Sequence, residues 1–231
     1  MKISCILTSY NRPKGVREAI ESVQRQTYPN WELIIVDDNS NISTKQILKK
    51  LVNKDPRLKL IQSGIKETDR QKSTRYATCI NLALSQVSGD LITYLTDDDI
   101  YYPQRFEKMV NVFQRSPQIY VVYGRQRVVN IKNGKITKKR LRPLIGVTKH
   151  PMSRVDHNSF MHRRSCLNLV KSWDDDPKYW RNGDAMFFRK LIKHWSFHPV
   201  NFITDEHRIH SKGIQAKMRK RKKPWEEKDA E

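Results

Sequence analysis

Hydrophobic and polar residues follow two different periods along the first 115 residues of the chain. Short apolar runs of strand length occupy residues 3–8, 31–36, 58–62 and 91–95. In the segments between and after them, apolar residues recur at helical spacing, over residues 13–27, 43–54, 74–87 and 103–113. This alternation predicts βαβ units and a mostly parallel sheet. The run 91–95 carries no charge, which is typical of a strand covered on both faces.

The second half of the chain has a different pattern. Strand-like runs at residues 119–131 and 136–144 flank an Asn133-Gly134 pair. Because Asn-Gly favours the tight turn of a hairpin, these runs predict two antiparallel strands. Residues 155–163 read as a further strand, and residues 184–195 as a helix with an apolar stripe. The whole chain is therefore expected to be an α/β protein.

Polar residues gather where three of the predicted strands end. These stretches are Thr8-Ser9-Tyr10-Asn11, Asp37-Asp38-Asn39-Ser40 and Thr96-Asp97-Asp98-Asp99. A pair of aspartates after a strand is commonly a solvated turn, but open parallel sheets bind ligands at this edge. Two carboxylate clusters at one edge favour a binding site.

Adjacent carboxylates are hard oxygen ligands suited to Mg²⁺ or Mn²⁺, and a cation held there would neutralise a diphosphate. Arg70, Lys72 and Arg75 lie after the third strand and could contribute positive charge. The chain has eight glycines, and it contains neither Gly-x-Gly-x-x-Gly nor a P-loop nor a serine nucleophile elbow. Phosphate binding is therefore expected to depend on a metal.

The net charge broadens the list of partners. The chain of 231 residues carries a formal charge of +21, and its last twenty residues account for 8 − 4 = +4. The remaining +17 is spread over the body, which would attract nucleic acid, an anionic membrane surface or an anionic glycan. Cys5, Cys79 and Cys166 are far apart in the sequence, so we expect neither a zinc site nor disulfides. No apolar stretch approaches the roughly 20 residues of a membrane span, so we expect a cytoplasmic protein that could lie peripherally at the inner face of the membrane.

Six segments together carry a resemblance to a known family. The sequence resembles the family 2 glycosyltransferases of GT-A fold, and within them the enzymes of spore-coat polysaccharide synthesis in bacilli. The matching segments are ILTSYNRP (6–13), ELIIVDDNSN (32–41), TRYATCINLAL (74–84), GDLITYLTDDDIYYPQR (89–105), VDHNSFMHR (155–163) and RNGDAMFF (181–188). The resemblance implies a Rossmann-like, mostly parallel central sheet with helices on both faces and a smaller mixed acceptor-side region. Residues 1–115 would bind the nucleotide-sugar, residues 116–211 the acceptor, and residues 212–231 would form a flexible basic tail.

The resemblance also implies an activity and a donor site. The chain would transfer a sugar, with inversion, from a UDP- or dTDP-sugar to a hydroxyl acceptor in surface or spore-coat polysaccharide synthesis, using Mn²⁺ or Mg²⁺. Thr8 and Tyr10 would line the base pocket, with Tyr10 stacking on the pyrimidine. Asp38 would accept from the pyrimidine N3–H, Arg70 would meet the diphosphate, and Asp97 would face the ribose.

The same resemblance assigns a metal ligand and a catalytic base. Asp98 would bind the metal. Asp99 stands where the spore-coat relatives have Asn, and it would contact the metal ligands without touching the metal, or line the acceptor side. Asp184 would deprotonate the acceptor hydroxyl on the face opposite the leaving diphosphate, although an Asp at that position could also cap its own helix. His157 either lines the acceptor pocket or is a core histidine.

Several assignments stay open from the sequence. His207 and His210 could close over the metal, and Trp173, Trp180 and Trp195 could form a sugar platform or simply pack in the core. The acceptor could be an anionic polymer, such as a teichoic-type polymer or modified DNA. A nucleic-acid-binding protein is the alternative of a different class, although no recognised nucleic-acid-binding motif is present. A nucleotidyltransferase would need a glycine-rich phosphate loop, which the first loop does not supply.

Overall fold

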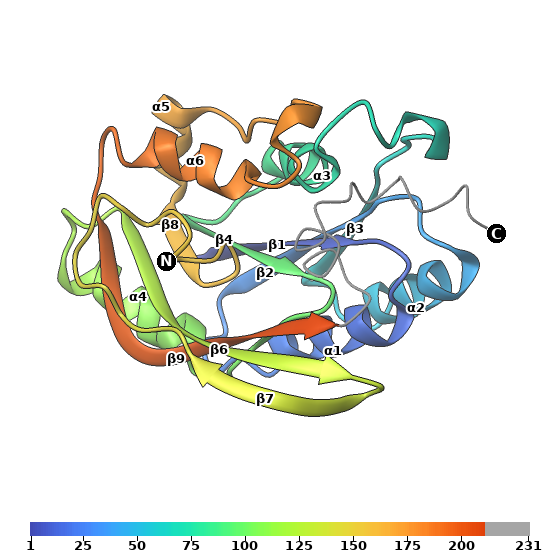
Figure 1. The fold of residues 1–231 in the computed structure, drawn as a ribbon, viewed down its shortest axis with the longest axis horizontal. Helices are drawn as coiled ribbons and strands as arrows, with labels where there is room; N and C mark the ends of the chain where they lie inside the picture. Colours follow the sequence, from blue (N-terminus) through green and yellow to red (C-terminus); the bar gives the residue numbers. More distant parts are fainter. Residues whose placement is uncertain (211–231) are drawn as a thin grey trace.

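The computed structural model describes residues 1–210 as a mixed α/β protein (Figure 1). The strands are β1 (Ile3–Ser9), β2 (Trp31–Asp37), β3 (Leu58–Gln62), β4 (Leu91–Thr96), β5 (Ile100–Tyr101), β6 (Val121–Lys132), β7 (Lys135–Leu141), β8 (Phe160–Arg163) and β9 (Phe197–His210). The helices are α1 (Pro13–Gln24), α2 (Ile42–Val52), α3 (Arg75–Leu84), α4 (Arg105–Arg115), α5 (Leu167–Val170) and α6 (Gly183–Leu191). The expected tail at residues 212–231 lies outside the described residues.

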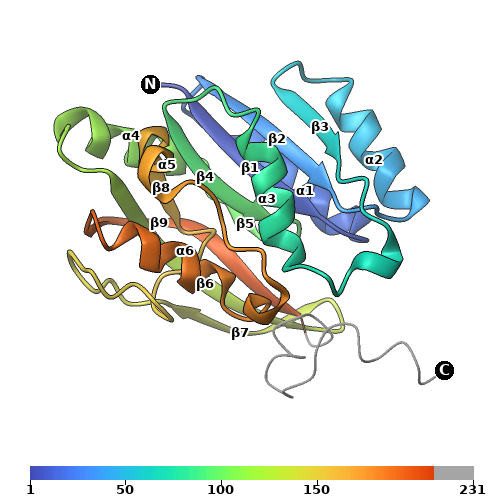
Figure 2. The same cartoon turned by 90° about the horizontal axis from the view of Figure 1, so that it is seen from above.

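One sheet runs through the molecule in the order β3-β2-β1-β4-β8-β6-β9-β5, and β7 pairs with β6. The strands β3, β2, β1 and β4 are parallel, as the alternating pattern predicts. Antiparallel pairing begins where β8 lies against β4 and continues between β8 and β6. The parallel half therefore brings the carboxyl ends of β1, β2 and β4 to one edge, which Figure 2 shows from above.

Two hydrophobic cores lie on opposite faces of this sheet (Figure 1). Cys5 and Leu7 of β1 pack on the face covered by α1, α2 and α4, whereas Ile6 between them packs on the face covered by α3, α5 and α6. Successive side chains of a strand point to opposite faces, so a strand buried on both sides needs apolar residues throughout. The prediction of an α/β fold with helices on both faces is confirmed.

One prediction for the second half needs correction, and one strand was missed. Only Phe160–Arg163 is a strand in the segment predicted to be one over 155–163, because residues 155–159 form a turn whose polar side chains bond one another and the backbone of the turn. The long strand β9 was not predicted at all. Its sequence holds Pro199 and several charged residues, so it lacks the apolar run of a buried strand.

Strand β9 is held by a buried ion pair. Arg105 of α4 donates to Asp205 of β9 over 2.9 Å, and neither side chain is exposed to solvent. Gln126 of β6 donates to the other carboxylate oxygen at 2.6 Å. Removing one partner of such a pair leaves a buried charge, which typically costs about 3–5 kcal/mol. This pair fixes the course of β9, whose last residues reach the edge where β1 and β4 end.

No helix among residues 1–210 is both long and apolar enough to cross a bilayer. The three cysteines are buried and free of disulfides, as the sequence indicates.

Candidate active site

The loops after β1 and β2 are tied together at the carboxyl edge of the sheet. Asn11 and Asn39 have φ values of 53° and 55°, in the left-handed region that asparagine tolerates better than most residues. Each therefore turns the chain sharply after its strand. The side chain of Asn11 accepts from the backbone N–H of Asn41 at 2.6 Å, and Ser40 Oγ accepts from the N–H of Asn11 at 3.0 Å.

The loop after β4 is joined to the loop after β1 through Asp97. The carboxylate of Asp97 accepts from the backbone N–H of Tyr10 at 2.7 Å and lies 3.4 Å from the guanidinium of Arg12. A Cβ on Gly15 would stand 2.3 Å from the carbonyl oxygen of Asp97, so α1 begins in direct contact with this loop. Burial, and next the charge of Asp98, raise the pKa of Asp97 to about 8 against the opposing charge of Arg12.

Two arginines converge on Asp38, the residue expected to select the base. Arg70 donates to Asp38 Oδ2 at 3.1 Å, and Arg75 donates to the same oxygen at 3.1 Å. The Arg70 guanidinium also lies 3.3 Å from the centroid of the Tyr10 ring. Thr8 lies in β1 between Val36 and Thr96. Arg70 thus covers one face of the Tyr10 ring.

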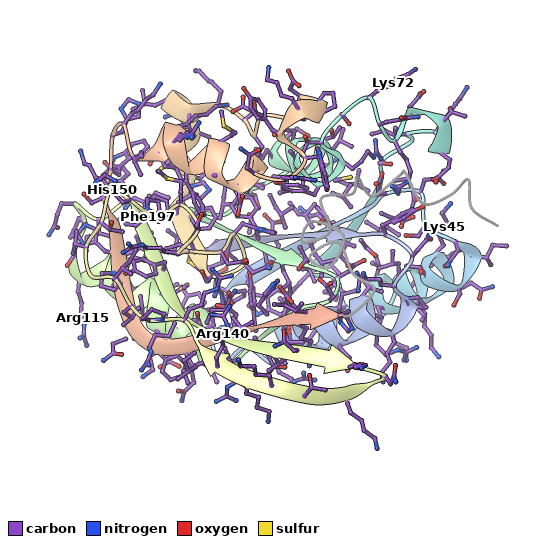
Figure 3. The ribbon with its side chains drawn as sticks, viewed as in Figure 1. Lys45, Lys72, Arg115, Arg140, His150 and Phe197 are labelled. Carbon is purple, nitrogen blue, oxygen red and sulfur yellow. The ribbon has the colours of Figure 1, made fainter. Side chains whose placement is uncertain are left out.

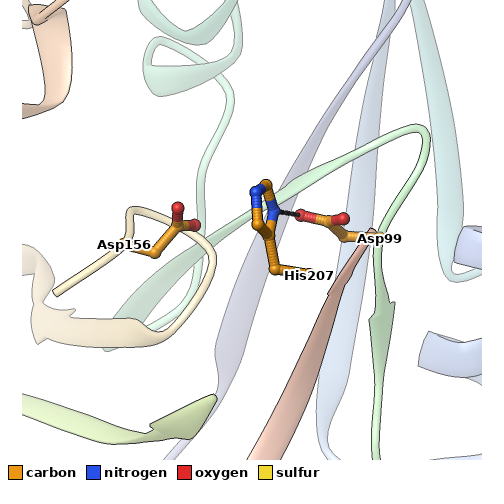
Figure 4. Close-up of side chains that lie close together, drawn as sticks. All are labelled: Asp99, Asp156 and His207. Atoms are coloured by element: carbon orange, nitrogen blue, oxygen red, sulfur yellow. Dashed lines mark hydrogen bonds and ion pairs between the residues drawn. The ribbon is translucent and has the colours of Figure 1, made fainter. Parts of the chain in front are cut away.

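Asp99 is fully buried and joins β4 to β9. Its carboxylate accepts from Asn158 Nδ2 at 2.6 Å, from the backbone N–H of Arg208 at 2.7 Å and from Thr96 Oγ1 at 3.2 Å. It also pairs with His207 Nδ1 at 2.8 Å (Figure 4). Oδ2 accepts from three of these partners, and Oδ1 accepts from the backbone N–H of Arg208. The residue therefore holds β9 against the acidic loop in this arrangement.

Asp156 lies on the other side of the His207 ring (Figure 4). Burial alone would lower the pKa of His207, but the carboxylates of Asp99 and Asp156 raise it to about 10. The imidazolium thus separates two carboxylates that would otherwise repel each other. Asp156 was not selected from the sequence, although it stands directly before His157 in a segment that carries the family resemblance.

Asp184 begins α6 and lies against Tyr76 of α3. Its backbone N–H donates to the Tyr76 hydroxyl at 3.1 Å, and its carboxylate accepts from the N–H of Ala185 at 2.8 Å. The second contact satisfies one N–H in the first turn of α6, although Asn182 and not Asp184 stands at the N-cap position. Burial raises the pKa of Asp184, with the charge of His157 opposing and that of Asp156 reinforcing this shift.

His157 stacks on the Tyr76 ring, with centroids 5.9 Å apart. This contact connects the Asp184 region to the turn that carries Asp156, and Asp156 in turn faces His207. The acidic loop after β4, the end of β9 and the start of α6 are therefore neighbours. Tyr76 is a further residue of this region that the sequence did not single out, because a tyrosine on a helix face looks like any core residue.

The three candidate tryptophans differ in burial, since Trp173 is buried whereas Trp180 and Trp195 are partly buried. Trp173 is 1% exposed and stacks on Phe187 with centroids 4.5 Å apart, so it belongs to the core. Trp195 stacks on Tyr120, and Arg181 lies over the ring of Trp180. Trp173 therefore cannot serve as a sugar platform.

The residues at the edge fit a divalent cation. Asp99, Asp156 and His207 could each offer one ligand atom, and these atoms lie within 4.8 Å of one another. Asp99 is fully buried and holds four hydrogen-bond partners, however. The side chain of Asp98 is 23% exposed, and within residues 1–210 its one ion pair is with Arg12 at 3.2 Å. A hard cation prefers such an accessible carboxylate oxygen. Either set could hold a cation, and Asp98 is the more accessible.

The fold and this edge define an α/β protein with an acidic site at the place where such sheets bind nucleotides. The profile described as Glycosyl transferase family 2 matches residues 4–228, and the chain belongs to this family. Protein CgeD of Bacillus subtilis is 43% identical over 210 residues, which cover 88% of this chain and 49% of the relative. The putative glycosyltransferase EpsE of B. subtilis is 32% identical over 177 residues, or 74% of this chain and 60% of the relative. The chain thus spans about half the length of the first of these relatives.

Solved structures give the same fold. The crystal structure of S. aureus TarS has a TM-score of 0.71 at 18% identity and covers 90% of this chain and 37% of TarS. The TarS 1-349 complex with UDP-GlcNAc has a TM-score of 0.69 at 19% identity, with 90% of this chain and 58% of that chain covered. The expected GT-A fold is confirmed. The particular likeness to spore-coat enzymes stays a prediction.

Proposed function

We propose that this chain is an inverting, metal-dependent glycosyltransferase that moves a sugar from a UDP- or dTDP-sugar to a hydroxyl acceptor. The observation that carries the proposal is the meeting of three loops at one sheet edge. Asp38 and Asp97 come from the parallel half, and Asp184 comes from the start of α6, with the charges of Asp156 and His157 acting on it. One side of this edge would hold the donor and the other the acceptor.

The names of similar proteins support the donor class. TarS was crystallised with UDP and with UDP-GlcNAc. An Escherichia coli relative, 32% identical over 61% of this chain, is described as a UDP-Glc:alpha-D-GlcNAc-diphosphoundecaprenol beta-1,3-glucosyltransferase. A UDP-sugar is therefore the first donor to test. A lipid-linked sugar is a reasonable first acceptor, alongside spore-coat and teichoic-type polymers.

The proposed donor site needs one rearrangement. A pyrimidine that stacks on Tyr10 and donates its N3–H to Asp38 would take the place that Arg70 holds. Arg70 would then be free to pair with the diphosphate, a short movement for a flexible guanidinium side chain. Thr8 and Asp97 would complete the pocket towards the base and the ribose.

Asp184 would act as the general base. Inversion requires one displacement at the anomeric carbon, so the acceptor hydroxyl must lose its proton on the face opposite the leaving diphosphate. A carboxyl with a raised pKa, as burial produces at Asp184, is a stronger base than an exposed one. Tyr76 and His157 would hold it in place. Mn²⁺ or Mg²⁺ bound by Asp98 would neutralise the charge that develops on the diphosphate.

The experiment is a screen of UDP- and dTDP-sugars for Mn²⁺-dependent hydrolysis by the full chain. Release of UDP or dTDP that stops with a chelator supports the proposal and identifies the donor. Salt-dependent DNA binding without binding of either nucleotide would instead favour the nucleic-acid-binding alternative. If the chelator left the release of UDP unchanged, the reaction would not require a metal, and that part of the proposal would be wrong.

A further inference from the structure

The outermost part of the sheet is a hairpin made by β6 and β7. Within the described residues, β7 pairs only with β6, so its other edge is unpaired. All residues from 132 to 141 are exposed, and we refer to them as the basic hairpin. Figure 3 labels Arg140 on this strand and shows side chains pointing from it away from the body of the protein.

The charged residues of this region are all positive. No acidic residue occurs between Glu107 and Asp156, and these 48 positions hold twelve lysines and arginines. Five of the twelve lie on the basic hairpin: Lys132, Lys135, Lys138, Lys139 and Arg140. None of these five forms an ion pair with any residue of the part of the chain that the structure describes. Their charges are available to a partner.

Apolar side chains stand among these cations. Ile136 is 48% exposed and Leu141 is 40% exposed, whereas buried positions hold most other large apolar residues of the chain. A hollow of about 450 Å³ lies beside Leu141 and is lined also by Arg127, Lys139 and Arg140. The hollow is open to solvent and brings three cations together with one apolar side chain.

Lysines on an edge strand have a simpler explanation. Charged residues there prevent edge-to-edge pairing with another chain. The exposed Ile136 at the hairpin end, however, works against that purpose. Edge protection therefore explains part of the charge but not the combination of cations with apolar residues.

We propose that the basic hairpin binds the surface of an anionic phospholipid membrane. Lysine and arginine side chains pair with lipid phosphates, and Ile136 and Leu141 enter the boundary between headgroups and acyl chains. A single-stranded nucleic acid would need aromatic side chains for base stacking, and residues 132–141 contain none. The mixture of cations and aliphatic residues fits a lipid surface better.

The hairpin lies close to the candidate active site. β7 pairs with β6, and β6 pairs with β9 so that Ile131 lies beside His210 and Val128 beside His207. With strands about 4.8 Å apart, β7 is about 10 Å from the histidines of the site. A membrane-bound hairpin would therefore hold the acidic edge next to the lipid headgroups, where a lipid-linked acceptor could reach it. The membrane proposal itself does not depend on the proposed transferase activity.

The test is co-sedimentation of the full chain with vesicles of phosphatidylglycerol and phosphatidylcholine, and with vesicles of phosphatidylcholine alone. The hairpin variant carries Lys135→Gln, Lys138→Gln, Lys139→Gln and Arg140→Gln. Each cation near an anionic surface contributes roughly a fivefold gain in partitioning. We therefore expect the variant to bind the anionic vesicles at least about tenfold more weakly. A second variant, Ile136→Ser, should weaken the binding that remains at high salt.

A matched control removes the same charge elsewhere. Lys49, Lys50, Lys54 and Lys193 are exposed, and none has an ionic contact within residues 1–210. Their replacement by Gln should leave at least half of the vesicle binding. Equal losses in the hairpin and control variants would overturn the proposal, since net charge alone would then explain binding. Binding of wild type to DNA but not to anionic vesicles would also overturn it.

Discussion

Replacing Asp99 by Asn should test whether this residue fastens β9 or binds the metal. An amide keeps one acceptor, whereas the Asp99 carboxylate accepts from Asn158, His207, Arg208 and Thr96. In its better orientation the amide would turn its NH₂ group towards the backbone N–H of Arg208. One backbone donor would then be unsatisfied, which costs about 1–3 kcal/mol, and the bond to the imidazolium would lose roughly 1 kcal/mol of its charge-assisted strength. We expect a loss of about 2–4 kcal/mol in the free energy of unfolding.

Urea denaturation measures this loss, and Asp98→Asn is the matched control. Asp98 is partly exposed, and among the described residues it forms an ion pair only with Arg12, so its replacement should change the free energy of unfolding by about 1 kcal/mol or less. Mn²⁺-dependent UDP binding should show the opposite order, lost in Asp98→Asn and retained in folded Asp99→Asn. The reasoning is refuted if Asp99→Asn is as stable as Asp98→Asn and yet loses the metal-dependent binding.

Three further outcomes are expected. Asp184→Asn should lower sugar transfer about 10²–10⁴-fold at unchanged UDP affinity, and nearly full activity in the folded variant would exclude it as the base. Gly183→Ala should cost about 1–3 kcal/mol of unfolding free energy, because a Cβ there would lie 2.4 Å from the Tyr76 hydroxyl; a variant as stable as wild type in urea would show that α3 and α6 can shift apart. Burial lowers the pKa of His162 to about 4, so the unfolded chain takes up the proton first and stability falls as the pH drops from 6.5 towards 4. Between pH 7 and 5 this amounts to about 2 kcal/mol, and His162→Gln should remove that part of the pH dependence in urea titrations.

The sequence predicted the parallel half of the fold well because burial on both faces demands apolar residues throughout. The middle of each of β1, β2 and β4 is mostly apolar, although Ser4, Glu32 and Thr93 are buried polar exceptions, and the loops after them follow from the fixed direction of parallel strands. β9 was not predicted because charged side chains on it point into the protein. Asp205 is buried against Arg105, and no local pattern distinguishes an inward charge from a solvated one.

The same limit applies to the candidate site. The sequence correctly placed Asp97, Asp98 and Asp99 at the carboxyl ends of the parallel strands. Adjacent residues of a turn point in different directions, however, and the sequence does not show which. Asp99 faces into the protein because His207, more than a hundred residues later, returns beside it. Asp156 was missed for a similar reason, since its importance comes from the approach of β9 and not from its neighbours in the chain.

The most direct test of the central proposal is a calorimetric titration of UDP, and then dTDP, into the full chain with excess Mn²⁺ and again with a chelator. Wild type should bind at least one of the two nucleotides only with Mn²⁺, and Asp98→Asn should not bind it in either buffer. Binding that survives both the chelator and the Asp98→Asn substitution would contradict the account.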